Sequence, residues 1–542
     1  MEKIKKLILS IVPDAVAEEA QYPTFTVDAS KIRSVAEKLK EKGFDYLICL
    51  TGMDYGDSLG CIYHISSSTD KTSVIVLKTS TSDRQNPTIP SVHDIWASAN
   101  LYEREVYDFF GITFIDHPDM RRLFLRQDWN GYPFRKDYDA NPELNPVPME
   151  NQTIAEMENM PSITLKSDGT VIKKENALFE KGDYVVNIGP QPPATHGVLH
   201  LRVSLDGEII KKVDPNFGYI HRGIEKMCES MTYPQMLHLT DRLDYLSGTI
   251  NRHAMCLCVE KAMGLEVPQR AQYVRCIFDE LTRIASHLLG WGCMCMDMGS
   301  ITAFIYGMRD REKIMDIFEE TGGGRLMVNY SVIGGLAEDV HPNFVNRVKE
   351  FIPYMRKMIK EYHILFTGNP IAKGRMKDIG FLSKETAVSL GVTGPSGRAS
   401  GFACDVRKIE PYAAYDKVQF EEVIREKGGT FDRYIIRLDE IEQSLRIIEQ
   451  LIDKLPDDGF RAKVPAIIKL PAGEYYQRVE NARGDFGVYI KSDGGKNPYR
   501  VKFRSPCMTL ISALDPLCQK EKIADLIMIG ASLDYVIPCA DR

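Results

Sequence analysis

The sequence predicts an α+β protein in two unequal parts: a small mixed N-terminal domain and a larger, mainly helical C-terminal domain. The chain has 542 residues, of which 44% are hydrophobic and 26% charged. That composition is ordinary for a soluble globular protein, and at roughly 100–200 residues per domain the length allows about two to four domains. Strand-like runs gather before residue 136, and long apolar stripes of helical period lie after residue 175.

Residues 1–136 are predicted to form the small α+β domain. The expected helices cover 3–11, 30–42 and 91–111, and the expected strands cover 45–55, 60–68 and 71–80. Residues 137–175 are predicted to be an extended linker, because this stretch holds four prolines and little apolar periodicity.

Residues 176–542 are predicted to form the larger domain. The segment HLRVSLDGEIIKKVD near its start indicates a hairpin that turns at Asp-Gly. Helices with apolar stripes are expected at 269–292 and 433–455, and both stripes are expected to face the core. The glycine-rich run at 391–401 lacks the context of a phosphate-binding loop and is predicted to be a tight structural loop.

Charge and cysteine usage exclude several classes of protein. The net charge of −7 is not that of a general nucleic-acid binder. The sequence contains no apolar run of about 18 residues, and its first twenty residues are interpreted as an amphipathic helix rather than a signal peptide, so a cytoplasmic chain is expected. None of the twelve cysteines forms a C-x-x-C pair, so no metal site is predicted and reduced, buried thiols are expected.

Two segments rich in glycine or proline carry the most distinctive polar residues. One is GPQPPATHGVLH, residues 189–200. The other is GYIHRGIEK, residues 218–226, which is followed by DRLDYLS at 241–247. Loops of this kind often hold functional side chains on a rigid scaffold.

These segments resemble a known family. Residues 176–542 are similar to the 49-kDa (D) component of respiratory complex I, the proton-pumping NADH–quinone oxidoreductase. Further matching segments are DRLDYLSGTINRHA, VEKAMGLEVPQRAQYVR, MDMGS, GVTGPSGRASG, DVRKIEPYAAYDKVQF and FGVYIKSDG. Residues 1–136 resemble the 30-kDa (C) component through EREVYDFFGITF and HPDMRRLFLRQDWNGYPFRKDY. The chain therefore resembles a fusion of the C and D components.

The resemblance implies a fold and a site. The larger domain should be like the large subunit of [NiFe]-hydrogenases, with small peripheral sheets. The family reduces quinone with electrons from a terminal [4Fe–4S] cluster that is held by a neighbouring subunit. Carried over by motif, the headgroup ligands would be His196 and Tyr245, and Asp297 would be the carboxylate that pairs with the histidine. Histidine and tyrosine suit this work because they can hydrogen-bond carbonyl oxygens and deliver protons.

Arg222 and Arg275 match family arginines close to the cluster. The implied partners are the cluster-bearing component B, the ferredoxin-like component I and the membrane component H. The chain would dock as a peripheral subunit on the cytoplasmic side of the cell inner membrane. The sequence leaves the electron donor open between NADH, ferredoxin and another carrier.

The chain departs from the family pattern at three positions. Pro192 stands where many members have histidine, and His200 stands where arginine is common. Met327 occupies the place of a histidine that is linked to the redox-coupled protonation of the cluster. The Met327 departure predicts a cluster potential with little pH dependence, suited to a low-potential quinone such as menaquinone.

Two alternatives have different sequence requirements. A hydrogenase large subunit needs two C-x-x-C pairs, whereas this chain has Asp244 and Ser247 at the first pair and Val536 and Cys539 at the second. One thiol is too few for a bimetallic centre. A purely structural connector of a membrane oxidoreductase would tolerate the loss of His196 and Tyr245.

Overall fold

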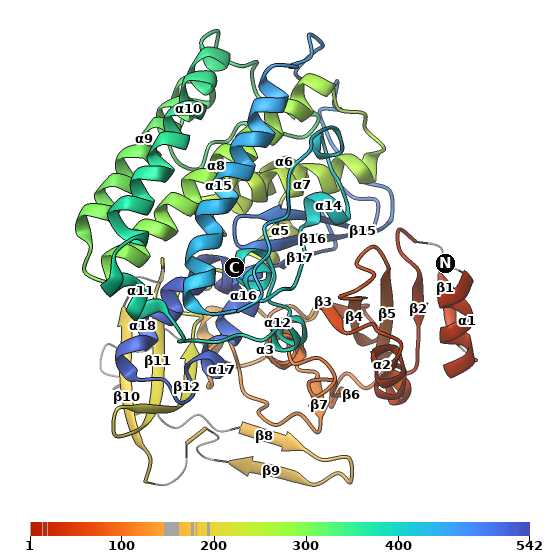
Figure 1. The fold of residues 1–542 in the computed structure, drawn as a ribbon. Coiled ribbons are helices and arrows are strands. Elements are labelled where there is room, and N and C mark those ends of the chain that lie inside the picture. The colour runs from red at the N-terminus through yellow and green to blue at the C-terminus, as the bar shows by residue number, and fades with distance from the viewer. Residues whose placement is uncertain are drawn as a thin grey trace.

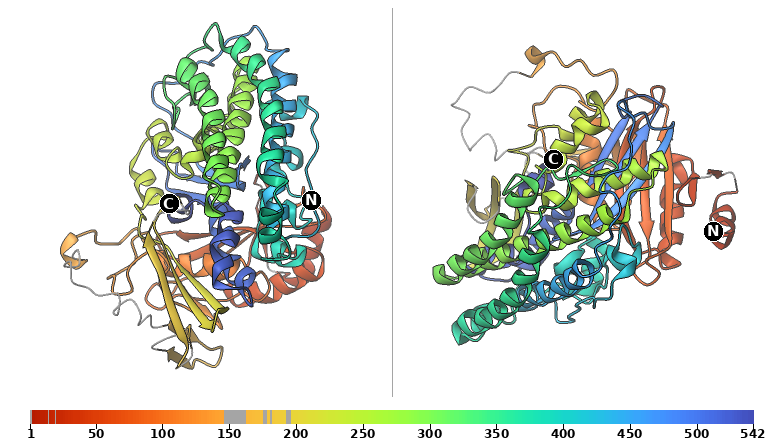
Figure 2. Two further views of the ribbon diagram at one scale, coloured as in Figure 1. Left: turned by 60° about the vertical axis from the view of Figure 1, so that its left-hand side comes forward. Right: turned by 90° about the horizontal axis from the view of Figure 1, so that it is seen from above.

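The structure is a computed structural model that describes residues 2–13, 15–18, 20–145, 162–174, 178–179, 182–191 and 196–542. Figure 1 shows a tall bundle of helices above a mixed N-terminal domain, and Figure 2 shows the same arrangement from two further sides. No helix within the described ranges is both long and apolar enough to cross a membrane.

The N-terminal domain has a five-stranded sheet with the order β1-β2-β5-β4-β3, in which only the β2–β5 pairing is parallel. Its elements are α1 (Glu2–Ile11), β1 (Val16–Glu18), β2 (Thr24–Thr26), η1 (Ala29–Lys31), α2 (Ile32–Glu41), β3 (Tyr46–Asp54), β4 (Leu59–Ser66), β5 (Val74–Thr81), β6 (Thr88–Pro90), α3 (Ala99–Phe110) and β7 (Thr113–Ile115). The predicted helices at 3–11 and 30–42 and the three predicted strands are therefore confirmed.

The helix predicted over 91–111 is wrong in its first part, because α3 begins only at Ala99. Tertiary contacts occupy the preceding segment. The Val92 N–H donates to a carboxylate oxygen of Glu103, 2.8 Å away, and the Trp96 indole N–H donates to the Phe44 carbonyl. These bonds replace the helical hydrogen bonds that the apolar pattern alone indicates.

Strand β3 is buried along its whole length. One face, with Leu47 and Leu50, joins the core shared with α2 and α3. The other face, with Tyr46 and Ile48, packs against Tyr476 and further residues of the C-terminal domain. A sheet that is covered on both faces explains the continuous apolar run of this strand.

The larger domain begins with an antiparallel sheet and continues as a helical bundle. The sheet and the helices that follow it are β10 (Tyr184–Gln191), β11 (Leu199–Asp206), β12 (Ile209–Asn216), α5 (Ile224–Ser230), α6 (Tyr233–Thr240), η3 (Tyr245–Ser247), α7 (Gly248–Met263), α8 (Gln269–Asp297), α9 (Ile301–Gly322), β13 (Ser331–Val332), β14 (Gly335–Leu336), α10 (Phe344–Tyr362), η4 (His363–Thr367) and α11 (Pro370–Met376). The hairpin predicted at Asp-Gly is β11–β12.

The rest of the domain returns to the bundle and then to a second small sheet. Its elements are α12 (Lys384–Leu390), α13 (Gly394–Ala399), α14 (Val406–Ile409), η5 (Tyr415–Lys417), α15 (Thr430–Ile452), β15 (Gly473–Asn481), β16 (Gly484–Ser492), β17 (Arg500–Arg504), α16 (Pro506–Ser512), α17 (Leu514–Cys518), α18 (Ile523–Leu533) and α19 (Ile537–Asp541). Helix α8 packs against α9 and α15, and α7 covers β15 and β16. The stripe of α8 that contains Ile277, Leu281 and Leu288 is fully buried, as predicted.

Two segments differ from their predicted conformation. The glycine-rich run at 391–401 contains the short helix α13 rather than only a loop. Gly394 has a φ of 64°, and a Cβ there would lie 2.5 Å from the Arg483 carbonyl oxygen, so only glycine fits this close approach. The predicted linker contains a hairpin, β8 (Ser162–Leu165) with β9 (Val171–Lys174), which bridges to Met120 of the N-terminal domain.

Candidate active site

The two predicted headgroup ligands and the carboxylate predicted to pair with the histidine lie at the ends of elements rather than within them. His196 occupies the turn before β11 and has a φ of 50°, a left-handed conformation that is uncommon for a residue with a side chain. Tyr245 begins η3, and Asp297 is the last residue of α8. Contacts between η3 and α8 bring the last two segments together.

A buried arginine holds the base of this site. Arg483, in the turn between β15 and β16, lies with its Nη1 2.9 Å from Asp244 Oδ2 and its Nη2 3.0 Å from Asp534 Oδ1. Asp244 directly precedes Tyr245 and accepts a hydrogen bond from the Leu246 N–H at the start of η3. The ion pair therefore sets the backbone that presents Tyr245.

The charges of two carboxylates, Asp534 and Asp244, act on His196. Burial lowers the pKa of His196, and the charge of Asp534 opposes part of that effect, so the imidazole is neutral at pH 7. Asp534 lies so close to α8 that a Cβ at Gly290 would be 3.0 Å from its carboxylate oxygens. A glycine at this point of α8 makes the space for the carboxylate.

Asp297 has no such ionic partner among the residues that the structure describes. Its Oδ2 atom is buried without a hydrogen bond, and burial raises the pKa of the carboxyl to about 6. Among the described residues, no hydrogen bond or ion pair joins Asp297 to His196. Their pairing stays a prediction.

Cys293 is a site residue that the sequence analysis missed. It is the single cysteine that is not fully buried, and it lies one helical turn before Asp297 on the same face of α8. Burial, together with the charges of Asp534 and Asp297, raises its pKa to about 12. Burial also raises the pKa of Tyr245. The charge of Cys293 acts in the same direction, and the charge of Arg483 lowers the pKa. The i, i+4 spacing from Asp297 was the signal that could have indicated Cys293.

Arg222 and Arg275 lie in different environments. Arg222 is exposed and lines a cavity of about 660 Å³ between the two domains, together with Phe124, Trp129 and Lys226. Arg275 is fully buried, and its guanidinium donates to both carboxylate oxygens of Glu260 at 3.0 and 2.7 Å. The structure does not bring these two arginines together.

Two of the three departures, Met327 and His200, lie in the described part of the chain. Met327 is half-buried after α9 and has a φ of 55°. His200 lies in β11, where its Nε2 is 3.1 Å from Asn187 Oδ1. Pro192 lies outside the described residues.

The positions of the hydrogenase ligands do not form a metal centre. Asp244 is engaged by Arg483, and Cys539 Sγ lies 3.0 Å from the Ser505 hydroxyl. Within the described part of the chain, no group of three histidine, cysteine or acidic side chains is arranged to hold a metal ion.

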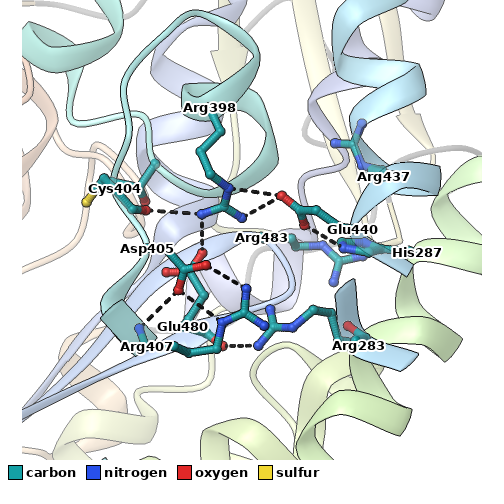
Figure 3. A network of polar contacts seen from close by, with 12 residues as sticks. Arg283, His287, Arg398, Cys404, Asp405, Arg407, Arg437, Glu440, Glu480 and Arg483 are labelled. Carbon is teal, nitrogen blue, oxygen red and sulfur yellow. Dashed lines mark hydrogen bonds and ion pairs between the residues drawn. The ribbon is translucent and has the colours of Figure 1, made fainter. Parts of the chain in front are cut away.

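Behind the site, the bundle contains a buried network of charges that the sequence analysis did not predict (Figure 3). Arg398 of α13 bridges Glu440 of α15 and Glu480 of β15. Glu440 also contacts His287 of α8, with Oε2 2.9 Å from Nε2. The network joins segments that are far apart in the sequence.

Two family models match the two parts of the chain, and both describe subunits of a respiratory-chain NADH dehydrogenase. Residues 25–143 match the family model described as "Respiratory-chain NADH dehydrogenase, 30 Kd subunit". Residues 297–469 and 463–542 match the model described as "Respiratory-chain NADH dehydrogenase, 49 Kd subunit". The resemblance of both halves to these components is thereby confirmed.

Relatives identify the particular family. The chain is 56% identical over 518 residues to the NADH-quinone oxidoreductase C/D subunit of Phocaeicola vulgatus, covering 95% of this chain and 99% of the relative. It is 55% identical over 529 residues to the C/D subunit of Bacteroides thetaiotaomicron, covering 96% and 99%. The NADH-quinone oxidoreductase D subunit of Desulforamulus reducens is 46% identical over 355 residues, which is 66% of this chain and 97% of the relative. The chain belongs to the family of NADH-quinone oxidoreductase C/D subunits.

Proposed function

We propose that this chain forms much of the quinone-reduction site of its oxidoreductase, with His196 and Tyr245 as headgroup ligands and Asp297 as a third polar group. The observation that carries the proposal is the shared surroundings of these residues. Cys293 acts electrostatically on Tyr245, and Asp297 acts in the same way on Cys293. The charge of Arg483 acts on both Tyr245 and His196. Three motifs from distant parts of the sequence thus meet at one half-buried site.

The chemistry of the side chains suits quinone reduction. The reaction consumes two electrons and two protons, and the electrons would come from a [4Fe–4S] cluster on a neighbouring subunit. A tyrosine whose pKa burial raises keeps its O–H and can donate a hydrogen bond to one carbonyl oxygen. A neutral imidazole can donate to the other oxygen.

Asp297 would respond to the charge of the site. Its carboxyl has a pKa of about 6, so a modest change in local charge changes its protonation. We propose that this change in the protonation of Asp297 triggers the coupling to the membrane arm. Full proton pumping in Asp297→Asn would contradict this step.

The assembly that we propose follows from the family. The partners are the cluster-bearing component B, the ferredoxin-like component I and the membrane component H, and the chain docks as a peripheral subunit on the cytoplasmic side of the cell membrane. Met327 in place of a histidine supports a low-potential quinone such as menaquinone.

The test is quinone reduction by membranes that carry Tyr245→Phe, with assembly checked on a native gel. The change removes one hydroxyl from a half-buried ring, so assembly should be normal and quinone reduction should collapse. Tyr475→Phe is the matched control, because the hydroxyl of the half-buried Tyr475 donates to the Pro471 carbonyl at the edge of β15, away from the proposed site. Unchanged activity in Tyr245→Phe would favour the structural connector instead.

A further inference from the structure

The network in Figure 3 and the carboxylates next to it form three groups of ion pairs. On one side, Arg283 and Arg407 neutralise Glu280 and Asp405 at 2.6–3.2 Å. On the side of the site, Arg483 and Arg437 neutralise the two carboxylates described above, Asp244 and Asp534, at 2.9–3.6 Å. Each of these groups has as many guanidinium groups as carboxylates.

The middle group is not balanced by its arginine. It consists of His287, Arg398, Glu440 and Glu480, here called the His287 tetrad. Arg398 Nη2 is 2.7 Å from Glu440 Oε1, and its Nη1 is 2.7 Å from Glu480 Oε1. One guanidinium therefore serves two carboxylates, and no member of the tetrad is more than 3% exposed. An uncompensated buried charge is costly, so the tetrad must hold a proton.

The charged residues around the tetrad indicate which of its two carboxyl groups binds that proton. Arg398, Asp405, Arg407 and Arg283 face Glu480, and burial raises the pKa of Glu480 to about 7. Glu440 keeps a lowered pKa, because Arg398 and His287 outweigh the effect of burial. Of the two carboxyl groups in the tetrad, Glu480 therefore binds a proton more readily than Glu440. The half-buried carboxylate of Glu422 adds further negative charge near Arg398.

The imidazole of His287 is a second group of the tetrad that can bind a proton, and it faces the proposed quinone site. Glu440 and Arg437 from α15 and Arg283 from α8 act on it, and burial lowers its pKa, so the imidazole is neutral at rest. Its Nε2 lies 2.9 Å from Glu440, whereas its Nδ1 is buried without a hydrogen bond. Asp534 carries a second buried atom without a hydrogen bond, Oδ2, and its charge is linked to both His287 and His196. The residue before His287, Ser286, contacts Arg483 Nη1 at 2.9 Å.

We propose that His287 is a redox-linked proton acceptor, which takes up a proton at Nδ1 when the quinone site gains negative charge. This inference rests on the proposed function. In the step, the Nδ1 lone pair binds a proton that comes from solvent water, the Nε2–H continues to donate to Glu440, and no electron is transferred. The imidazolium then compensates for the negative charge that the electrons bring to the quinone site.

The test is redox-difference infrared spectroscopy on the intact complex in membranes from cells grown with ¹⁵N-histidine, so that histidine bands are identified by their isotope shift. Reduction by the physiological donor should produce an imidazolium band that is lost in His287→Gln. Glutamine keeps an N–H donor for Glu440 but has no second basic nitrogen. His253→Gln is the matched control, because His253 is also buried, lies 2.6 Å from a carboxylate oxygen of Asp279 and has an Nε2 without a hydrogen bond.

A second variant keeps the inference testable if His287→Gln fails to fold. Glu480→Gln mimics the protonated glutamate, so the band should persist in it at wild-type amplitude. Persistence of the band in His287→Gln, or its loss in His253→Gln or Glu480→Gln, would overturn the inference. Quinone reduction by Tyr245→Phe is measured in parallel, so that a failure of the proposed site is distinguished from a failure of His287 to protonate.

Discussion

Arg542, at the C-terminal end of the sequence, forms an ion pair with Glu105 of the N-terminal domain, in which Nη2 lies 2.9 Å from Oε2. Both residues are buried, and Glu105 also contacts Lys502 of β17. Glu225 completes the group through Arg542 Nη1 at 3.2 Å. One cluster of charges therefore joins the 30-kDa-like and 49-kDa-like parts of the chain.

Glu105→Gln should weaken this contact between domains. The substitution leaves Arg542 and Lys502 buried with less negative charge, which costs about 3–5 kcal/mol in comparable cases. Urea unfolding of the purified chain measures the effect. Glu37→Gln is the control, because its pair with Arg33 is on the surface and such pairs contribute about 1 kcal/mol or less. Equal effects of both variants would contradict the assigned role of Glu105.

Asp297→Asn should change the pH dependence of the oxidoreductase. The folded protein holds the Asp297 carboxyl at a pKa of about 6, above the value of about 3.9 in an unfolded chain. Because folding raises this pKa, the protonated carboxyl contributes to the stability of the folded chain. That contribution is complete below about pH 4 and is lost as the pH rises through 6. Quinone reduction should therefore show an inflection near pH 6 in the wild type. A profile with the same inflection in Asp297→Asn would assign it to another group.

Met327→His should make the cluster potential depend on pH. Met327 has a φ of 55°, and histidine adopts this left-handed conformation more readily than most residues, so the backbone should accept it. A redox titration followed by electron paramagnetic resonance should show a slope approaching about 59 mV per pH unit for one proton per electron. Leu326→His is the control, because Leu326 is 45% exposed and precedes the family position. If the slope did not change, position 327 would lie too far from the cluster to affect its potential.

Arg222→Ala and Arg275→Ala should fail in different ways. Arg275 donates to Glu260 and to the carbonyl oxygens of Val332 and Gly335, so its loss leaves a buried carboxylate unpaired and should destabilise the domain by about 3–5 kcal/mol. Arg222 is exposed at the cavity between domains, so Arg222→Ala should leave stability unchanged. In the proposed assembly, Arg222→Ala should also lower the potential of the cluster that a neighbouring subunit would hold, because a nearby cation favours the reduced form. Thermal unfolding and a redox titration separate the two effects, and a destabilised Arg222→Ala would show a structural role instead.

Motif resemblance located several candidate residues but not their surroundings. His196, Tyr245 and Asp297 each lie in a short sequence segment that can be identified without a structure. Arg483 could not be identified in this way, because the residue it holds, Asp244, lies 239 positions earlier in the sequence. Asp534, whose charge acts on His196, likewise lies far from it in the sequence. Local patterns contain no information on which distant carboxylate an arginine neutralises.

The sequence by itself determined the family, the order of the two parts and most long elements, because apolar periodicity and motif order are local properties of the chain. Only the tertiary structure decided where α3 begins, that the predicted linker holds a hairpin, and that His287 belongs to a group with one guanidinium for two carboxylates. These features depend on which segments pack together in a medium where unpaired charges and hydrogen-bonding groups are costly. Burial of that kind is a property of the folded chain as a whole.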